Sequence, residues 1–166
     1  IRLSLVGSEM CIRDSYSPLY TLHLLAALIW VGGMFFAWMV LRPATATLQA
    51  PERLTLWLEV FRRFFVWVWI AVVALPITGV GMLHTGFSGF DGAPRYVHVM
   101  IGLYLAMLAL FLRIQALQLP AMRRAVETQD WSAAGASLGR IRRLVAFNLL
   151  LGLAVVVVLA AARPSL

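Results

Sequence analysis

The sequence has no lysine and only one cysteine. Cys11 on its own allows no intramolecular disulfide. No Ser-His-Asp or Cys-His grouping occurs at helical spacing, and no glycine-rich phosphate-binding loop follows a strand pattern. These absences argue against hydrolases and nucleotide-driven pumps.

Charged residues are also missing from four long stretches, 17–41, 64–85, 96–112 and 144–162. Each stretch has about 17–25 residues, the length that a helix needs to cross a hydrocarbon core of about 30 Å. In lipid a segment must satisfy its own backbone hydrogen bonds, so we expect helices and not isolated strands. No carboxylate lies within the stretches, which argues against a carboxylate proton relay. The sequence therefore predicts an all-α fold, a bundle of four transmembrane helices.

All fourteen basic residues are arginines, and the net charge is +7. Most lie in the connections after the first and third stretches: Arg42, Arg53, Arg62, Arg63, Arg113, Arg123, Arg124, Arg140, Arg142 and Arg143. By the positive-inside rule we expect these Arg-rich loops to be cytoplasmic and both termini to be periplasmic. This distribution indicates contacts with anionic lipid headgroups and argues against nucleic acid as a partner.

Residues 1–15, IRLSLVGSEMCIRDS, differ from the rest of the chain. They lack the basic start and the apolar centre of a signal peptide. The string resembles a translated sequencing-adapter artefact, so we interpret it as a non-native segment. Residues 16–166 are then predicted to form a single four-helix transmembrane domain.

Several residues predict where the helices begin, bend and end. We expect the first helix to stop before Arg42-Pro43, and the second to open at Pro51-Glu52. The apolar residues of 54–61 are expected to form an amphipathic lead-in at the membrane interface. Pro76 removes a backbone donor and predicts a bend in the second helix. Asp130 is a candidate N-cap for the fourth helix.

The three histidines are predicted to meet at one face of the membrane. His23 lies near the start of the first apolar stretch, His84 at the end of the second, and His98 at the start of the third. Because successive spans cross in opposite directions, these positions share a water boundary, on the side away from the Arg-rich loops. Ionisable residues within membrane spans are candidates for function. We expect a metal site at this boundary, for either copper or a haem iron.

Helical spacing leaves both metals open. His23 shares a face of its helix with Trp30, and His98 shares one with Gly102. Gly102 would leave room for a flat macrocycle with Trp30 against its edge, and paired imidazoles can hold a b-type haem. His84 is a candidate third ligand or a neighbour of the ligands. Copper is suggested by the methionines, since thioethers suit Cu(I), but no His-x-Met ladder or Cys pair supports it.

One run of residues resembles a family signature. Residues 22–36, LHLLAALIWVGGMFF, followed by Leu41-Arg42-Pro43, are similar to the first helix of CopD-like (copper resistance D) membrane proteins. Further similar segments are Phe64–Trp69, Tyr96–Met100 and Asp130–Arg143 with Asn148. The resemblance implies a bacterial inner-membrane protein of copper uptake or tolerance.

The preferred hypothesis combines this resemblance with the positions of the histidines. Copper is expected to be handled at periplasmic His23, His98 and His84, by a binding or permeation component and not a catalyst. The expected partners are the lipid bilayer, a periplasmic metal or electron carrier, and a second copy of the chain in a homodimer.

A second resemblance is to the oxygen-independent protoporphyrinogen oxidase family, which is thought to bind haem. His23 and His98 match its histidines, whereas Met100 stands where that family has a lysine. It implies a haem-b redox protein with His23 and His98 as axial ligands. A third alternative is a structural membrane subunit in which the histidines are incidental.

Overall fold

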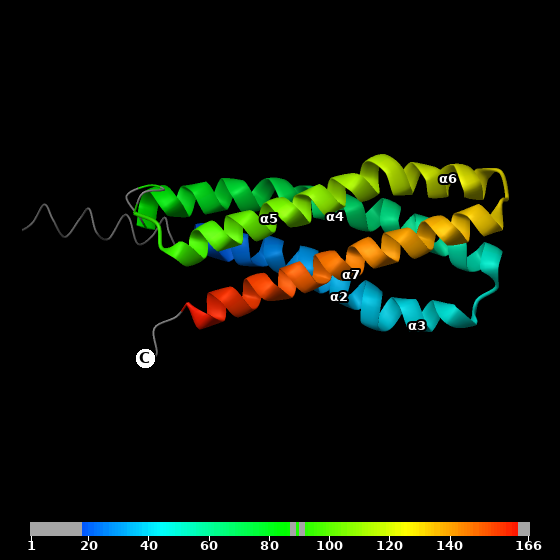
Figure 1. The fold of residues 1–166 in the computed structure, drawn as a ribbon, viewed down its shortest axis with the longest axis horizontal. Coiled ribbons are helices and arrows are strands. Elements are labelled where there is room, and N and C mark those ends of the chain that lie inside the picture. Colours follow the sequence, from blue (N-terminus) through cyan, green and yellow to red (C-terminus); the bar gives the residue numbers. More distant parts are fainter. Residues whose placement is uncertain (1–17, 87–88, 90–91, 163–166) are drawn as a thin grey trace, which may run out of the picture.

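The computed structural model describes residues 18–86, 89 and 92–162. Within these residues every regular element is helical. Figure 1 shows the long helices side by side along one axis. The predicted non-native segment 1–15, which includes Cys11, lies outside the described residues, as does part of the connection after Gly86.

The four helices each have the length and apolar character to cross a membrane. Two of them contain other helical turns: the first has π and 3-10 segments, and the third has one π segment. The first, Pro18–Thr47, contains η1 (Leu28–Gly32), α2 (Gly33–Phe36), η2 (Ala37–Leu41), α3 (Arg42–Ala44) and η3 (Thr45–Thr47); the second is α4 (Ala50–Gly86); the third joins α5 (Arg95–Arg113), η4 (Ile114–Gln118) and α6 (Leu119–Glu127); the fourth is α7 (Trp131–Ala161).

The helices are longer than the uncharged stretches. The prediction that the first helix ends before Arg42-Pro43 is wrong, because the helix runs on to Thr47. Pro43 is accommodated in the first turn of α3, directly after the π-helical turn η2, where a missing backbone donor is tolerated. The expected N-cap is confirmed, since the Asp130 carboxylate accepts a hydrogen bond from the Ala133 N–H at 2.9 Å.

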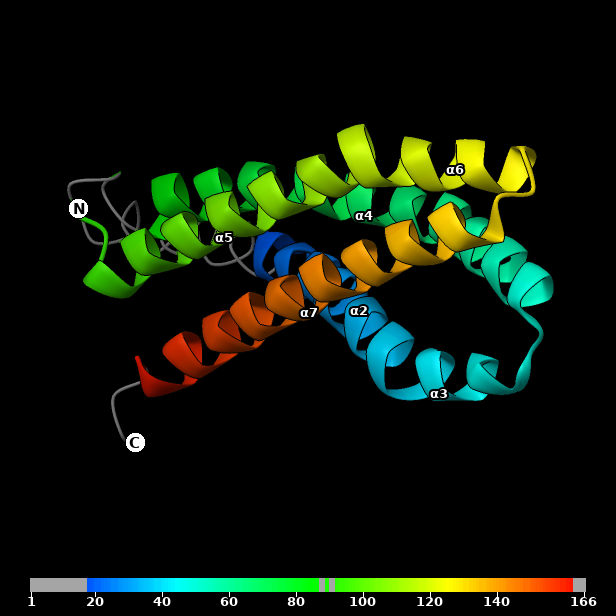
Figure 2. The same cartoon turned by 45° about the vertical axis from the view of Figure 1, so that its right-hand side comes forward.

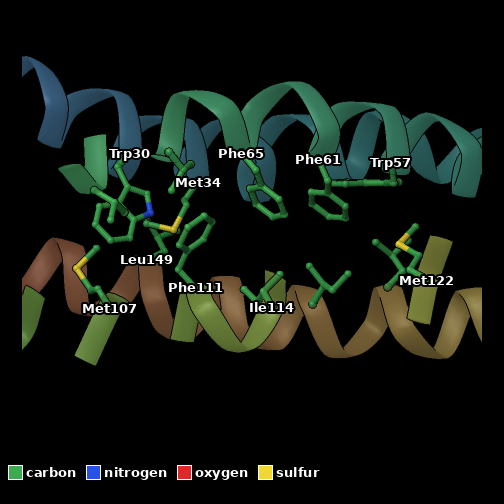
Figure 3. Packing of buried hydrophobic residues seen from close by; sticks show 14 of the residues in the cluster. Trp30, Met34, Trp57, Phe61, Phe65, Met107, Phe111, Ile114, Met122 and Leu149 are labelled. Atoms are coloured by element: carbon green, nitrogen blue, oxygen red, sulfur yellow. The ribbon is translucent and has the colours of Figure 1, made fainter. Parts of the chain in front are cut away.

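A row of aromatic rings fills the space between the helices (Figure 3). Phe61 stacks on Phe65 with ring centroids 5.4 Å apart, and Phe65 meets Phe111 of α5 edge-on at 5.5 Å. The apolar face of the predicted lead-in 54–61 does not face outwards, because Leu54, Trp57 and Phe61 are buried in this core. The reason is that α4 continues as one helix, so its first turns pack against α6 and α7.

Small residues let the first helix approach its neighbours closely. A Cβ added to Gly33 would overlap the Phe64 ring of α4. A Cβ added to Gly152 of α7 would lie 2.7 Å from Cγ2 of Val31. The first helix therefore packs on both α4 and α7, and α7 also runs along α5 and α6 (Figure 2).

Much of the outer surface of the bundle is apolar. The four helices contain windows of mean hydropathy 2.1–2.8, of which only 17–33% is buried. Large side chains such as Leu28 and Val157 are 66% exposed. Helices that are apolar all round fit a bilayer, where lipid covers the outer faces. The predicted all-α, four-helix membrane architecture is confirmed.

Candidate functional site

His23 lies near the start of the first helix, His84 near the end of α4 and His98 near the start of α5. Figure 1 shows these three helix ends at one end of the bundle, opposite the end where α3 and α6 lie. His23 is half-buried on the first helix, whereas His84 on α4 and His98 on α5 are exposed. Among the described residues, no group of three or more His, Cys, Asp or Glu side chains is placed to hold a metal ion. The structure thus brings the helix ends together without assembling three ligands.

His23 is the histidine that the surrounding structure holds. Its Nδ1 lies 2.8 Å from the Thr78 hydroxyl oxygen, across the interface between the first helix and α4. The single Thr78 hydroxyl hydrogen has an acceptor of its own, the Ala74 carbonyl at 2.7 Å. We infer that Thr78 donates to Ala74 and accepts from His23, so that Nδ1 carries the ring proton. In this tautomer Nε2 has no proton and carries the lone pair of the ring.

The imidazole of His23 lies against a glycine. A Cβ added to Gly79 would be 3.6 Å from Cε1 of His23, an ordinary van der Waals contact. Thr78 is 4% exposed, so its hydrogen bond with the ring is shielded on the α4 side. The imidazole therefore lies close to the backbone of α4 at Gly79, and the Thr78 hydroxyl holds the ring through Nδ1.

A proline supplies the neighbouring polar contact. Pro76 has no N–H, so the Val72 carbonyl one turn earlier loses its helical donor. The Tyr104 hydroxyl of α5 donates to this carbonyl at 2.9 Å. Tyr104 also meets Trp30 edge-on, with ring centroids 6.3 Å apart. The carbonyl that Pro76 leaves without a helical donor thus accepts a hydrogen bond that connects α5 to α4.

The faces predicted for a haem differ from those in the structure. The exposed face of α5 contains His98, Gly102 and Leu105. A Cβ added to Gly102 would have no atom of another helix within 4 Å. Trp30 is 2% exposed and packs edge-on against Tyr104 and Phe111. Gly102 therefore opens no gap between helices, and aromatic rings occupy the space beside Trp30 (Figure 3). This packing does not favour the haem alternative.

Sequence reasoning missed Thr78 and Tyr104. Pro76 signals that the Val72 carbonyl needs another donor, but periodicity does not say which helix supplies it. Thr78 carries no signal beyond its hydroxyl in an apolar stretch. Thr78 and Tyr104 each make a hydrogen bond with a neighbouring helix, and only the packing of the helices shows these contacts.

The family model for CopD, copper resistance protein D, matches residues 58–162. The chain belongs to the CopD family. The match covers more than half of the chain and includes Thr78, His84, His98 and Tyr104, while His23 precedes it. No curated protein and no solved structure matches the chain at a significant level. Membership of the CopD family together with four apolar helices identifies a multi-pass membrane protein of copper-resistance type.

Proposed function

We propose that this CopD-family protein binds copper at His23, on the periplasmic side of the bacterial inner membrane, as part of copper uptake or tolerance. The observation that carries the proposal is the contact between Nδ1 of His23 and the Thr78 hydroxyl at 2.8 Å. Ligating histidines commonly donate their second ring N–H to a fixed acceptor, which sets the tautomer and orients the lone pair. Thr78 is placed to do this for Nε2 of His23.

The side of the membrane follows from charge. The arginine-rich connections lie at the end of the bundle opposite the histidines, and such connections are retained in the cytoplasm. The histidine end is then periplasmic. In that position His23 meets copper before the ion reaches the hydrocarbon region.

His84 and His98 are the proposed additional ligands. Both are exposed at the same end of the bundle, on α4 and α5. One oriented imidazole with two exposed ones suits transient binding, in which a periplasmic carrier shares the ion before its release. We therefore propose a binding or permeation component and not a catalyst.

Copper affinity tests the proposal. The full chain in detergent is titrated with Cu(I) in competition with a chromophoric chelator, and the variants are His23→Ala, Thr78→Val and Thr55→Val. Thr78→Val keeps the shape of the side chain but removes the acceptor for Nδ1, and loss of such a partner weakens metal binding by about 10–100-fold. His23→Ala is expected to weaken it at least as much.

Thr55→Val is the matched control. Thr55 makes the same type of hydrogen bond to its own helix, to the Pro51 carbonyl at 2.9 Å, but lies at the far end of α4. Equal affinities for the wild type, Thr78→Val and His23→Ala would refute the proposal. A dithionite-reduced Soret band in the purified protein would refute it in favour of haem.

A further inference from the structure

The arginine-rich end of the bundle contains a groove of about 420 Å³. It is lined by the end of the first helix, the start of α4 and α7, and its charged residues are Arg42, Arg53 and Arg142. Ion pairs in the described part of the chain lie elsewhere: Glu59 with Arg62 and Arg63, and Glu127 with Arg123. The groove therefore gathers three positive charges with no carboxylate to neutralise them.

Two of these guanidinium groups are positioned by tryptophans. The Arg42 guanidinium carbon lies 4.5 Å from the centre of the Trp38 ring, and that of Arg142 lies 5.0 Å from the centre of the Trp57 ring. Both distances are within the range of cation–π attraction. The arginines are thus held at the groove before any ligand arrives.

The Trp57 ring is itself fixed. Its Nε1–H donates to the Thr45 hydroxyl oxygen at 3.0 Å, and Thr45 donates to the Leu41 carbonyl at 2.9 Å. Thr45 and Trp57 are each 3% exposed. The buried Thr45 hydroxyl therefore orients the indole on which Arg142 packs. This series of contacts connects the core of the bundle to the groove.

The Arg142 guanidinium has a hydrogen-bond donor that is not used in this arrangement. Its Nε is buried and, within the described residues, has no hydrogen-bond partner. Arg42 and Arg53 also repel its charge. A buried polar group without a partner calls for an explanation, and so do three like charges at one groove. An anion bound between them would relieve the repulsion and accept hydrogen bonds.

We propose that the groove binds a phosphate group, either the headgroup phosphate of a membrane lipid or a free phosphate anion. The guanidinium fork matches phosphate oxygens in geometry and forms charge-assisted hydrogen bonds with them. A tetrahedral phosphate presents oxygens to three directions at once, whereas a planar carboxylate presents two. The apolar lining by Met39, Pro43 and Ala46 offers a surface for the uncharged part of a lipid whose headgroup phosphate is bound.

The test measures thermal unfolding of the delipidated full chain in an uncharged detergent. One arm adds inorganic phosphate against chloride at equal ionic strength. The other adds phosphatidylglycerol against an uncharged, phosphate-free glycolipid. The dependence of the unfolding midpoint on ligand concentration gives the affinity. The variants are Arg142→Gln and Arg53→Gln. Arg53 does not pack on Trp57, so Arg53→Gln still tests the proposal if Arg142→Gln disturbs the fold.

Arg140→Gln is the matched control. It removes the same charge from the same helix, but Arg140 is exposed and does not line the groove. Loss of a charged hydrogen-bond partner is expected to weaken binding about tenfold or more in Arg142→Gln and Arg53→Gln. Arg140→Gln is expected to bind as the wild type does.

The two arms separate the sources of the phosphate. Stabilisation by both ligands supports a free phosphate anion as sufficient, and stabilisation by phosphatidylglycerol alone supports a lipid headgroup. If neither ligand stabilises the protein, the proposal is overturned. An equal loss of affinity in Arg140→Gln would also overturn it, because the effect would then come from overall charge.

Discussion

The two ends of the bundle hold their polar residues in different ways. At the arginine-rich end, Arg142 rests on Trp57, whose indole is fixed by the buried Thr45 hydroxyl. At the histidine end, the His23 ring contacts Thr78 and Gly79 of α4 directly, and His84 and His98 are exposed. One end is therefore ordered through several layers of side chains, and the other through the contacts of one imidazole with one neighbouring helix.

This difference agrees with the two proposed uses. A lipid or phosphate anchor benefits from groups fixed in advance, because less conformational freedom is lost on binding. A site that passes copper onward must release the ion, so weakly held ligands are suitable. We infer that the arginine-rich end stabilises the bundle in the membrane and that the histidine end remains open for exchange.

The largest predicted effect separates the ends by their contribution to stability. Trp57→Ala removes a buried indole from the core and is expected to lower the free energy of unfolding by about 3–5 kcal/mol. His23→Ala loses one hydrogen bond and half-buried contacts, for which we expect about 1 kcal/mol. Reversible unfolding in mixed micelles measures both. Equal losses would show that the histidine end is as important for stability as the arginine-rich end.

A smaller effect is expected between the two ends, where Tyr104 meets α4. Tyr104→Phe leaves the Val72 carbonyl without a donor in the bundle, which costs about 1–3 kcal/mol. Pro76→Ala restores the backbone N–H that this carbonyl would otherwise use. We therefore expect Tyr104→Phe to destabilise the Pro76→Ala variant less than the wild type. Additive losses in the double-mutant cycle would argue against the compensation.

Much of the fold could be predicted because the bilayer imposes simple rules. Charge-free stretches of sufficient length identified the four helices, and Asp130 marked the start of α7 through its capping side chain. The helix ends were predicted too short at Arg42-Pro43, because the charged turns that extend the spans have no apolar signal. The π-helical turn η2 before Pro43 was also invisible to a pattern of uniform period.

The candidate site could be predicted only in part. Antiparallel crossing places the three histidines towards one end of the bundle, as the order of the spans requires. Which of them is held depends on rotation of each helix about its axis. That rotation puts His98 on the exposed face of α5 and His23 against Thr78. The sequence of one helix does not determine it, since apolar residues surround the whole circumference.

The smallest predicted effect tests whether order at the arginine-rich end passes from the core to the groove. Thr45→Val leaves the Trp57 N–H without its acceptor, and we expect a loss of about 1 kcal/mol in the free energy of unfolding. Thr55→Val removes a similar hydroxyl from an exposed position and should change stability less. Phosphate affinity is the second measurement. Because Thr45 reaches Arg142 only through Trp57, its loss should weaken binding less than Arg142→Gln does. If Thr45→Val binds phosphate as tightly as Thr55→Val does, Arg142 keeps its position without a fixed indole. The two ends of the bundle would then differ in their charge and not in how firmly their polar side chains are held.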